Sequence, residues 1–182
     1  MKMAKKLLAL VLTGVMAMSV LTGCGSTASR QATGKLEGML KEANPKATVE
    51  VGSEELANKA IEAVTTKEGK FKTDAYDKIK AALKEGNNDK YVWYACFEAA
   101  GKNKTDKAQA IADEILTKKT DGTVTINYYN AVNYLNVRIP GNYIKAGDEF
   151  VLSMKEFTVT NDDGTTTDWI MAVVTCKAVA SK

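Results

Sequence analysis

Cysteine is the residue type in this chain with the most reactive side chain, and the 182 residues include three cysteines and no histidine. The absence of histidine removes Ser-His-Asp and Cys-His catalysis and any zinc site with a histidine ligand. Cys96 lies in an aromatic run and Cys176 in an apolar one. They form a disulfide if their Cα atoms lie within about 7 Å, and otherwise they are two buried thiols that act as small hydrophobic side chains. Both interpretations stay open here.

A second group of candidate residues lies between positions 127 and 136, where asparagine recurs every third residue among three tyrosines. Asparagine amides donate and accept hydrogen bonds and tyrosine rings offer a flat apolar face, which suits sugar rings. We therefore consider a surface that binds a glycan or wall polymer. Its candidate residues are Tyr128, Tyr129, Asn130, Asn133 and Tyr134. A period of three fits neither a strand nor a straight helix, so on a strand the four asparagines would alternate between the two faces. The alternative interpretation is therefore a strand pair whose polar positions simply face solvent.

Carboxylates in the C-terminal half are the remaining candidates for catalysis. Two of them could hydrolyse a glycosidic bond if they were held about 5–10 Å apart. They are Glu149, Glu156, Asp162, Asp163 and Asp168. No spacing places two of them in a cleft, so we name no catalytic residue and expect no cofactor. Residues 161–168 offer the oxygen ligands that calcium prefers but lack the EF-hand register, so we expect a solvated hairpin turn and no metal site.

The first 24 residues have the pattern of a targeting segment. Three lysines, at positions 2, 5 and 6, precede an apolar run over residues 7–20, which is shorter than the roughly 20 residues of a membrane span. Leu21-Thr22-Gly23-Cys24 follows. The segment resembles the signal peptide and lipobox of bacterial lipoproteins. The resemblance covers residues 1–24 only and implies that residues 1–23 are removed and that Cys24 carries a diacylglycerol.

The same resemblance implies a location and a first partner. The chain would be anchored through Cys24 in the outer leaflet of the cell membrane and would face the exterior or the periplasm. Two or three acyl chains anchor firmly, because each buried methylene contributes about 0.8 kcal/mol. The formal charge of +3 comes from 25 basic and 22 acidic residues, and three of the basic residues precede Cys24. The chain from Cys24 onward is therefore neutral, and we expect no nucleic-acid partner.

The elements that would position these residues change in character along the chain. Residues 24–34 are small and polar and predict a flexible tether, and residues 35–182 have the length of one domain. Helical spacing of apolar residues predominates before residue 120, and alternation predominates after it. Helices followed by strands predict an α+β fold, with N-terminal helices packed on one face of a C-terminal antiparallel sheet of about four strands.

Three segments within this plan carry more specific predictions. Residues 91–97 are ambiguous, and we favour a buried helix over a strand because Trp93 and Phe97 would share a helix face. The alternation of apolar residues changes phase after Met154, which predicts a β-bulge near residues 155–156. Residues 169–179 are almost continuously apolar, which predicts a strand buried on both faces.

The sequence therefore favours a non-catalytic, lipid-anchored domain outside the cytoplasm that binds a small ligand, a wall polymer or a surface protein. The alternative is a small histidine-free hydrolase that uses carboxylates on cell-wall or glycan substrates. A deep pocket with converging carboxylates would favour the hydrolase, and an exposed aromatic and asparagine surface would favour the binding domain.

Overall fold

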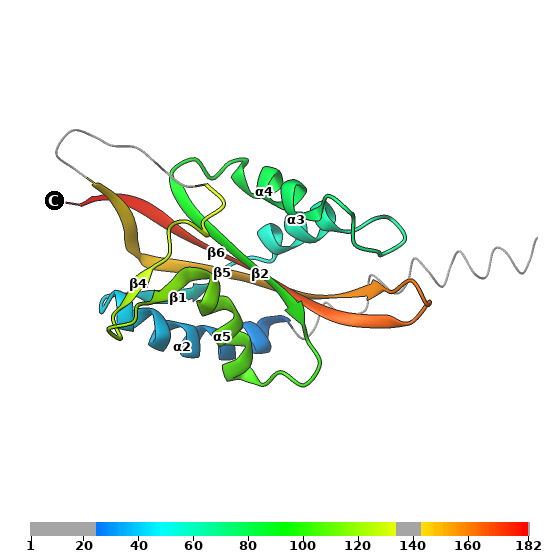
Figure 1. The fold of residues 1–182 in the computed structure, drawn as a ribbon, viewed down its shortest axis with the longest axis horizontal. Helices are drawn as coiled ribbons and strands as arrows, with labels where there is room; N and C mark the ends of the chain where they lie inside the picture. The colour runs from blue at the N-terminus through cyan, green and yellow to red at the C-terminus, as the bar shows by residue number, and fades with distance from the viewer. Residues whose placement is uncertain (1–24, 134–142, 182) are drawn as a thin grey trace, which may run out of the picture.

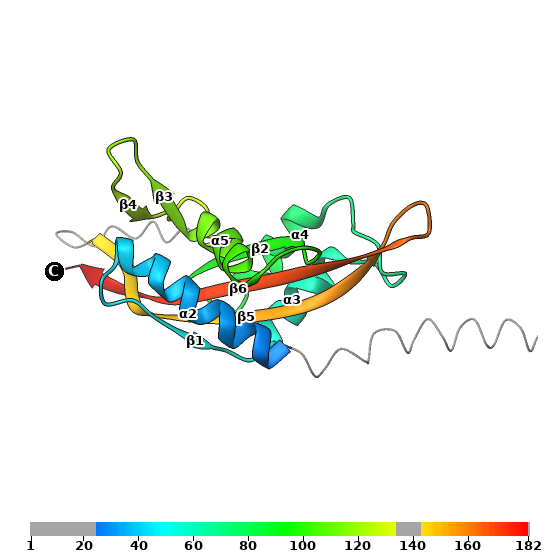
Figure 2. The same ribbon diagram turned by 90° about the horizontal axis from the view of Figure 1, so that it is seen from below.

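The computed structural model describes residues 25–133 and 143–181, which form helices on both sides of a twisted sheet (Figures 1 and 2). The helices are α2 (Gly25–Ala43), α3 (Glu55–Val64), α4 (Ala75–Lys84) and α5 (Lys104–Ile115). The strands are β1 (Thr48–Val51), β2 (Lys90–Glu98), β3 (Leu116–Lys118), β4 (Val124–Ile126), β5 (Tyr143–Thr160) and β6 (Thr166–Ser181). The predicted α+β class is confirmed.

The main sheet has four strands in the order β1-β5-β6-β2. The β5–β6 hairpin forms its centre, and the strands from the N-terminal half occupy its two edges. β2 pairs with β6 antiparallel, but β1 pairs with β5 in parallel. The sheet is therefore mixed, and the prediction of a purely antiparallel sheet was wrong. Alternation patterns do not reveal which strands become neighbours, because pairing is a long-range contact.

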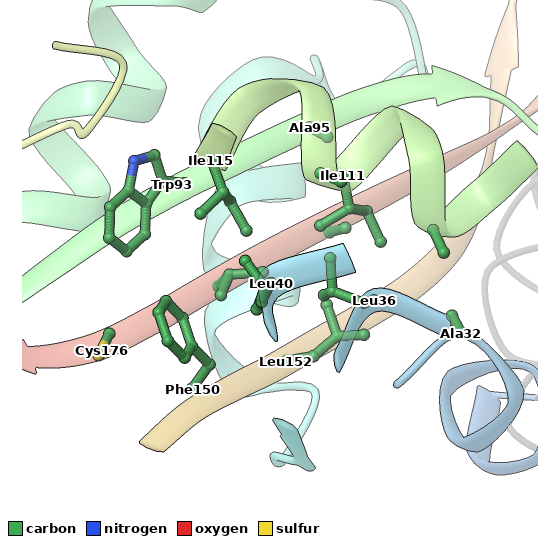
Figure 3. Close-up of a cluster of buried hydrophobic side chains, with 14 of the residues drawn as sticks. Ala32, Leu36, Leu40, Trp93, Ala95, Ile111, Ile115, Phe150, Leu152 and Cys176 are labelled. Carbon is green, nitrogen blue, oxygen red and sulfur yellow. The ribbon is translucent and has the colours of Figure 1, made fainter. Parts of the chain in front are cut away.

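The helices cover both faces of this sheet and not one face as we predicted. The buried residues of α2 and α5 pack on the face that carries Trp93, Phe150 and Ile170, which we call the α2 face (Figure 3). The buried residues of α3 and α4 pack on the opposite face, the α3 face, against Met171 and Val173. We call the buried clusters on these two faces the α2 core and the α3 core. β6 is thus apolar on both sides, as its continuous hydrophobic run predicted.

The phase change along β5 arises from these two cores and not from a bulge near residues 155–156. Met154 faces the α2 core, whereas Phe157 and Val159 face the α3 core. The pairing of β5 with β6 runs without a break from Phe150 to Thr160, and the irregularity lies between Ala146 and Phe150. The strand is regular at residues 155–156. What changes there is the face of the sheet on which its apolar side chains are buried.

Residues 90–98 form strand β2, so the predicted helix at 91–97 was wrong. β2 pairs with β6 along its full length, from Lys90 opposite Lys177 to Glu98 opposite Trp169. Tyr91 and Trp93 point to the α2 core while Val92 points to the α3 core. Because both sides of the strand contact apolar layers, the sequence lacks the alternation that would have identified a strand.

Helix α2 begins at Gly25, within the segment that we predicted to be a flexible tether. Ser29, Ala32 and Thr33 are buried, and Ala32 belongs to the same core cluster as Ala108 and Ala112 of α5. Small side chains allow two helices to approach closely, so here a composition typical of linkers serves helix packing. No helix in residues 25–133 or 143–181 is long and apolar enough to cross a membrane.

The β5–β6 hairpin ends in the turn that the sequence predicted at residues 161–164. The Gly164 N–H donates to the Asn161 carbonyl at 3.0 Å, and Gly164 has φ +83°, a conformation that favours glycine. A loop between α3 and α4 lies against this end of the hairpin, where the Thr160 N–H donates to the Gly69 carbonyl at 3.0 Å. Phe71 of that loop packs edge-on against Trp169, with ring centroids 5.0 Å apart.

Candidate functional site

The tyrosines and asparagines of the predicted ligand surface separate into structural and exposed residues. Tyr128 is half-buried against the α2 core, its ring lies 4.8 Å from that of Tyr91, and its hydroxyl accepts a hydrogen bond from the Ala146 N–H at 3.1 Å. Tyr129 is 87% exposed. Tyr134 lies outside the described residues, so its predicted role is untested. Tyr128 therefore packs the loop onto the domain and offers little face to a ligand.

Asn133 holds the same loop against the edge of the sheet. Its Oδ1 accepts a hydrogen bond from the Val92 N–H at 3.0 Å. Its Nδ2 donates to the carbonyl of Asn87 at 2.6 Å and to the carbonyl of Lys90. Asn130 is exposed, and its Nδ2 donates to Glu114 Oε2 at 3.3 Å. The amide of Asn133 is thus occupied by the fold, and within the described part of the surface only Tyr129 and Asn130 remain exposed to a ligand.

The two thiols do not form the disulfide that the sequence allowed, and both are free. Cys176 points into the α2 core, whereas Cys96 packs against the α3 core on the other side of the sheet. Cys176 lies opposite Tyr91 in the strand pairing, so Cys96 is five residues further along β2. At about 3.3 Å per residue the two levels differ by roughly 17 Å, far beyond the reach of a disulfide.

Burial makes these thiols weaker acids than a thiol in water, and this predicts that the domain loses stability at alkaline pH. Burial raises the pKa of both Cys96 and Cys176 from 9.0 to about 12, and it raises the pKa of Tyr94 from 10.0 to about 12. The unfolded chain therefore binds fewer protons than the folded chain between about pH 9 and 12. Stability from these groups is complete below pH 9 and is lost as the pH rises towards 12.

We expect the free energy of unfolding, measured by urea titration, to fall steadily above pH 9. The double variant Cys96→Ala/Cys176→Ala should show a shallower fall over the same range, because two of the three ionisations are removed. An equal slope in the wild-type chain and the double variant would show that the thiols do not contribute.

Most of the carboxylates that could have served a hydrolase have partners of their own. Glu156 Oε1 lies 3.0 Å from Lys107 Nζ, and Asp162 Oδ1 lies 2.9 Å from Lys70 Nζ. Asp168 Oδ1 accepts a hydrogen bond from the Thr158 hydroxyl at 2.8 Å, and Asp163 Oδ1 accepts one from the Thr165 N–H within the hairpin turn. Glu149 is exposed and lies opposite Thr48 of β1. Across residues 25–133 and 143–181, no three His, Cys, Asp or Glu side chains gather as metal ligands.

The feature with the clearest capacity for binding is the outer side of β2, which sequence analysis missed. Among residues 25–133 and 143–181, β2 is an edge strand whose neighbour in the sheet is β6. Near its start the outer side is covered, because the Val132 N–H donates to the Val92 carbonyl at 2.7 Å and the Val92 N–H donates to Asn133. The backbone groups of Val92 therefore point away from β6.

The backbone groups of Tyr94, Cys96 and Glu98 point in the same outward direction, because this direction recurs at every second residue of a strand. Within the described residues, their N–H and C=O groups make no hydrogen bond. We call these three residues the open edge. Unpaired strand edges are templates for another strand, and folded proteins usually protect them.

Helices α4 and α5 flank the open edge, because β2 runs between them (Figures 1 and 2). Tyr76 of α4 is 62% exposed, and Lys80 Nζ lies 4.0 Å from its ring centroid. Glu114 of α5 is half-buried, and burial and then the charge of Asp113 raise its pKa. After burial, the charges of Tyr76 and Glu114 are the next causes of the raised pKa of Tyr94.

This arrangement can bind an extended chain segment. The open edge offers three N–H donors and three C=O acceptors in one row, and aromatic and carboxylate side chains lie beside it. No local sequence pattern indicates the site, because an open edge depends on which strands pair. No protein-family model, curated protein or solved structure matches this chain, so the site is interpreted from its own geometry.

Proposed function

We propose that the chain is a lipid-anchored, non-catalytic module outside the cytoplasm that binds an extended segment of a protein partner at the open edge. The observation that carries this proposal is the row of backbone groups on Tyr94, Cys96 and Glu98 that have no partner in the part of the chain that the structure describes. A bound segment would add a fifth strand next to β2. Backbone hydrogen bonds would supply affinity, and contacts with Tyr76 and Glu114 would supply selectivity.

The start of α2 supports an anchor that leaves the open edge accessible. Cys24 directly precedes the helix, so an acylated Cys24 would hold the folded domain close to the lipid without a long tether. Figure 2 shows the first turns of α2 on the side of the sheet where β1 lies, with β2 along the opposite edge. The open edge therefore lies away from the point of attachment.

The anchor is tested by replacing its acceptor. We expect Cys24→Ala to move the protein from the membrane fraction to the soluble fraction, because the acyl chains that bind the bilayer are no longer attached. Cell fractionation with immunoblotting measures this distribution. Cys96→Ala is the matched control, since it removes a thiol of the folded domain and should leave the protein in the membrane. Membrane retention of Cys24→Ala would refute the anchor.

The binding edge is tested by photocrosslinking in intact cells. A photoreactive amino acid at position 98 should form a protein adduct, whereas the same amino acid at exposed position 163, on the tip of the β5–β6 hairpin, should not. Adding Cys96→Pro should abolish the adduct, because proline removes an outward N–H and leaves the bonds to β6 intact. An adduct that survives Cys96→Pro, or none at position 98, would contradict the proposed edge.

A further inference from the structure

We infer that the strand which occupies the open edge is β2 of a second copy of this chain, in an antiparallel pair centred on Cys96. This inference rests on the proposed function, since it names the partner of the same site. It would join the two four-stranded sheets into one continuous sheet of eight strands around a twofold axis. A symmetric pair of this kind uses the same residues on both copies.

The unpaired groups determine a single register for this pair. Within β2, and counting bonds among the described residues alone, Tyr94, Cys96 and Glu98 have free outward groups, because those of Val92 are occupied by Val132 and Asn133. A twofold axis at Cys96 places Tyr94 opposite Glu98 of the second copy and the two Cys96 residues opposite each other. All three residues of each copy then form hydrogen-bonded pairs. A shift of two residues in either direction would leave one of the three without a free outward partner.

The side chains of the five residues 94–98 are complementary when the strand is paired with itself. On the α3 face the Tyr94 hydroxyl of one copy would meet the Glu98 carboxylate of the other, which joins a hydrogen-bond donor to a charged acceptor. On the α2 face Ala95 would lie opposite Phe97, which joins a small side chain to a large one. The central Cys96 pair adds no charge. The registered strand therefore has no like-charge pair to oppose association.

The position of the anchor is compatible with this geometry. The twofold axis of an antiparallel strand pair is perpendicular to the sheet, so both copies present the same face in the same direction. Helix α2 packs on the α2 face through Ala32, Leu36 and Leu40. The two α2 helices, and the Cys24 residues that precede them, would thus lie on one side of the joined sheet. Both acyl anchors would enter the same membrane.

Attachment to one membrane also explains how a short interface could be occupied. Three residues per copy make at most six backbone hydrogen bonds, which is a small contact. Confinement of both copies to a bilayer raises their effective concentration, so a weak contact is populated without additional area. We therefore expect dimers mainly in the lipidated, membrane-bound chain.

The test uses the full lipidated chain, purified and reconstituted into phosphatidylglycerol and phosphatidylethanolamine vesicles. Two variants are made in a Cys96→Ser background, one with Tyr94→Cys and the other with Glu98→Cys. With oxidised glutathione as the oxidant, two protein thiols form one disulfide while the oxidant is reduced to two glutathione thiols. We expect a crosslinked dimer when the two variants are mixed, since positions 94 and 98 face each other across the axis. Each variant alone should crosslink far less, since positions four residues apart are about 13 Å away along the strand.

A second measurement does not depend on these substitutions. Cys96→Ala keeps the outward N–H and should retain the dimer, observed by fluorescence energy transfer between labelled copies in the vesicles. Cys96→Pro removes two of the six hydrogen bonds and should weaken the dimer about tenfold or more. Equal energy transfer in these variants, or no crosslink specific to the mixture, would overturn self-pairing. The proposed function would then still stand if the photoadduct at position 98 in cells contained a different protein, and it would fall with self-pairing if no adduct formed.

Discussion

Replacing Trp93 by alanine is expected to lower the free energy of unfolding by about 3–5 kcal/mol, the largest effect of any single substitution considered for this chain. Trp93 is fully buried in the α2 core (Figure 3), with its ring stacked on Tyr91 at 5.8 Å between centroids and tilted towards Phe150 at 6.2 Å. Its Nε1 also donates to the Asn127 carbonyl at 2.8 Å. The substitution therefore creates a cavity and leaves a carbonyl of the 127–133 loop without its donor.

The two tryptophans of the chain provide a matched control that separates packing from hydrogen bonding. Trp93→Phe keeps an aromatic ring but leaves the Asn127 carbonyl unpaired, so it should cost about 1–3 kcal/mol. Trp169 has a buried Nε1 with no hydrogen-bond partner within the described residues, so Trp169→Phe should cost much less. Urea unfolding followed by circular dichroism measures both. Equal losses for the two phenylalanine variants would contradict the role assigned to the Trp93 hydrogen bond.

Replacing Asn133 by alanine is expected to cost about 2–4 kcal/mol, although asparagine in a loop is usually tolerant of change. Its amide bonds the Val92 N–H and the carbonyls of Asn87 and Lys90. The Val92 N–H and the Lys90 carbonyl would lose their partner together, and the Asn87 carbonyl would keep only the bond from the Lys90 N–H at 3.3 Å. The substitution should also speed hydrogen exchange of the Val92 amide and extend the unpaired edge of β2 by one residue.

Asn130→Ala is the control for this prediction. Asn130 lies in the same loop, but it is exposed and its side chain bonds only Glu114 at 3.3 Å among the contacts described. Its loss should change the free energy of unfolding by less than about 0.5 kcal/mol. Similar costs for the two variants would mean that Asn133 does not hold the loop on the sheet.

Local patterns in the sequence were sufficient where the structure depends on neighbours in the chain. The helical spacing before residue 120, the glycine turn at residues 161–164 and the doubly buried strand 169–179 agree with the helices, the hairpin turn and β6 of the structure. Each depends on periodicity or on turn residues within a few positions. The lipobox resemblance is also local, and the anchor on Cys24 stays a prediction.

The errors lie where a local pattern has two physical meanings. In β2, an apolar run fits a buried helix and a strand between two cores equally well, and only pairing with β6 separates them. In α2, small residues fit a tether and a close helix contact, and only the packing of α2 against α5 decides. The phase change after Met154 resembles a bulge but records a change in the face that is covered.

The candidate site shows the same difference between what local sequence patterns determine and what long-range contacts determine. The sequence alone determined the residue types, including the absence of histidine, and it determined the α+β class and the neutral charge after Cys24. Tertiary structure alone decided that Cys96 and Cys176 lie on opposite faces and that Asn133 is a structural residue. It also decided that the outward backbone groups of Tyr94, Cys96 and Glu98 have no partner among the described residues. These outcomes depend on strand order and on the side of the sheet that each residue faces, which are contacts between segments far apart in the chain that no local periodicity encodes.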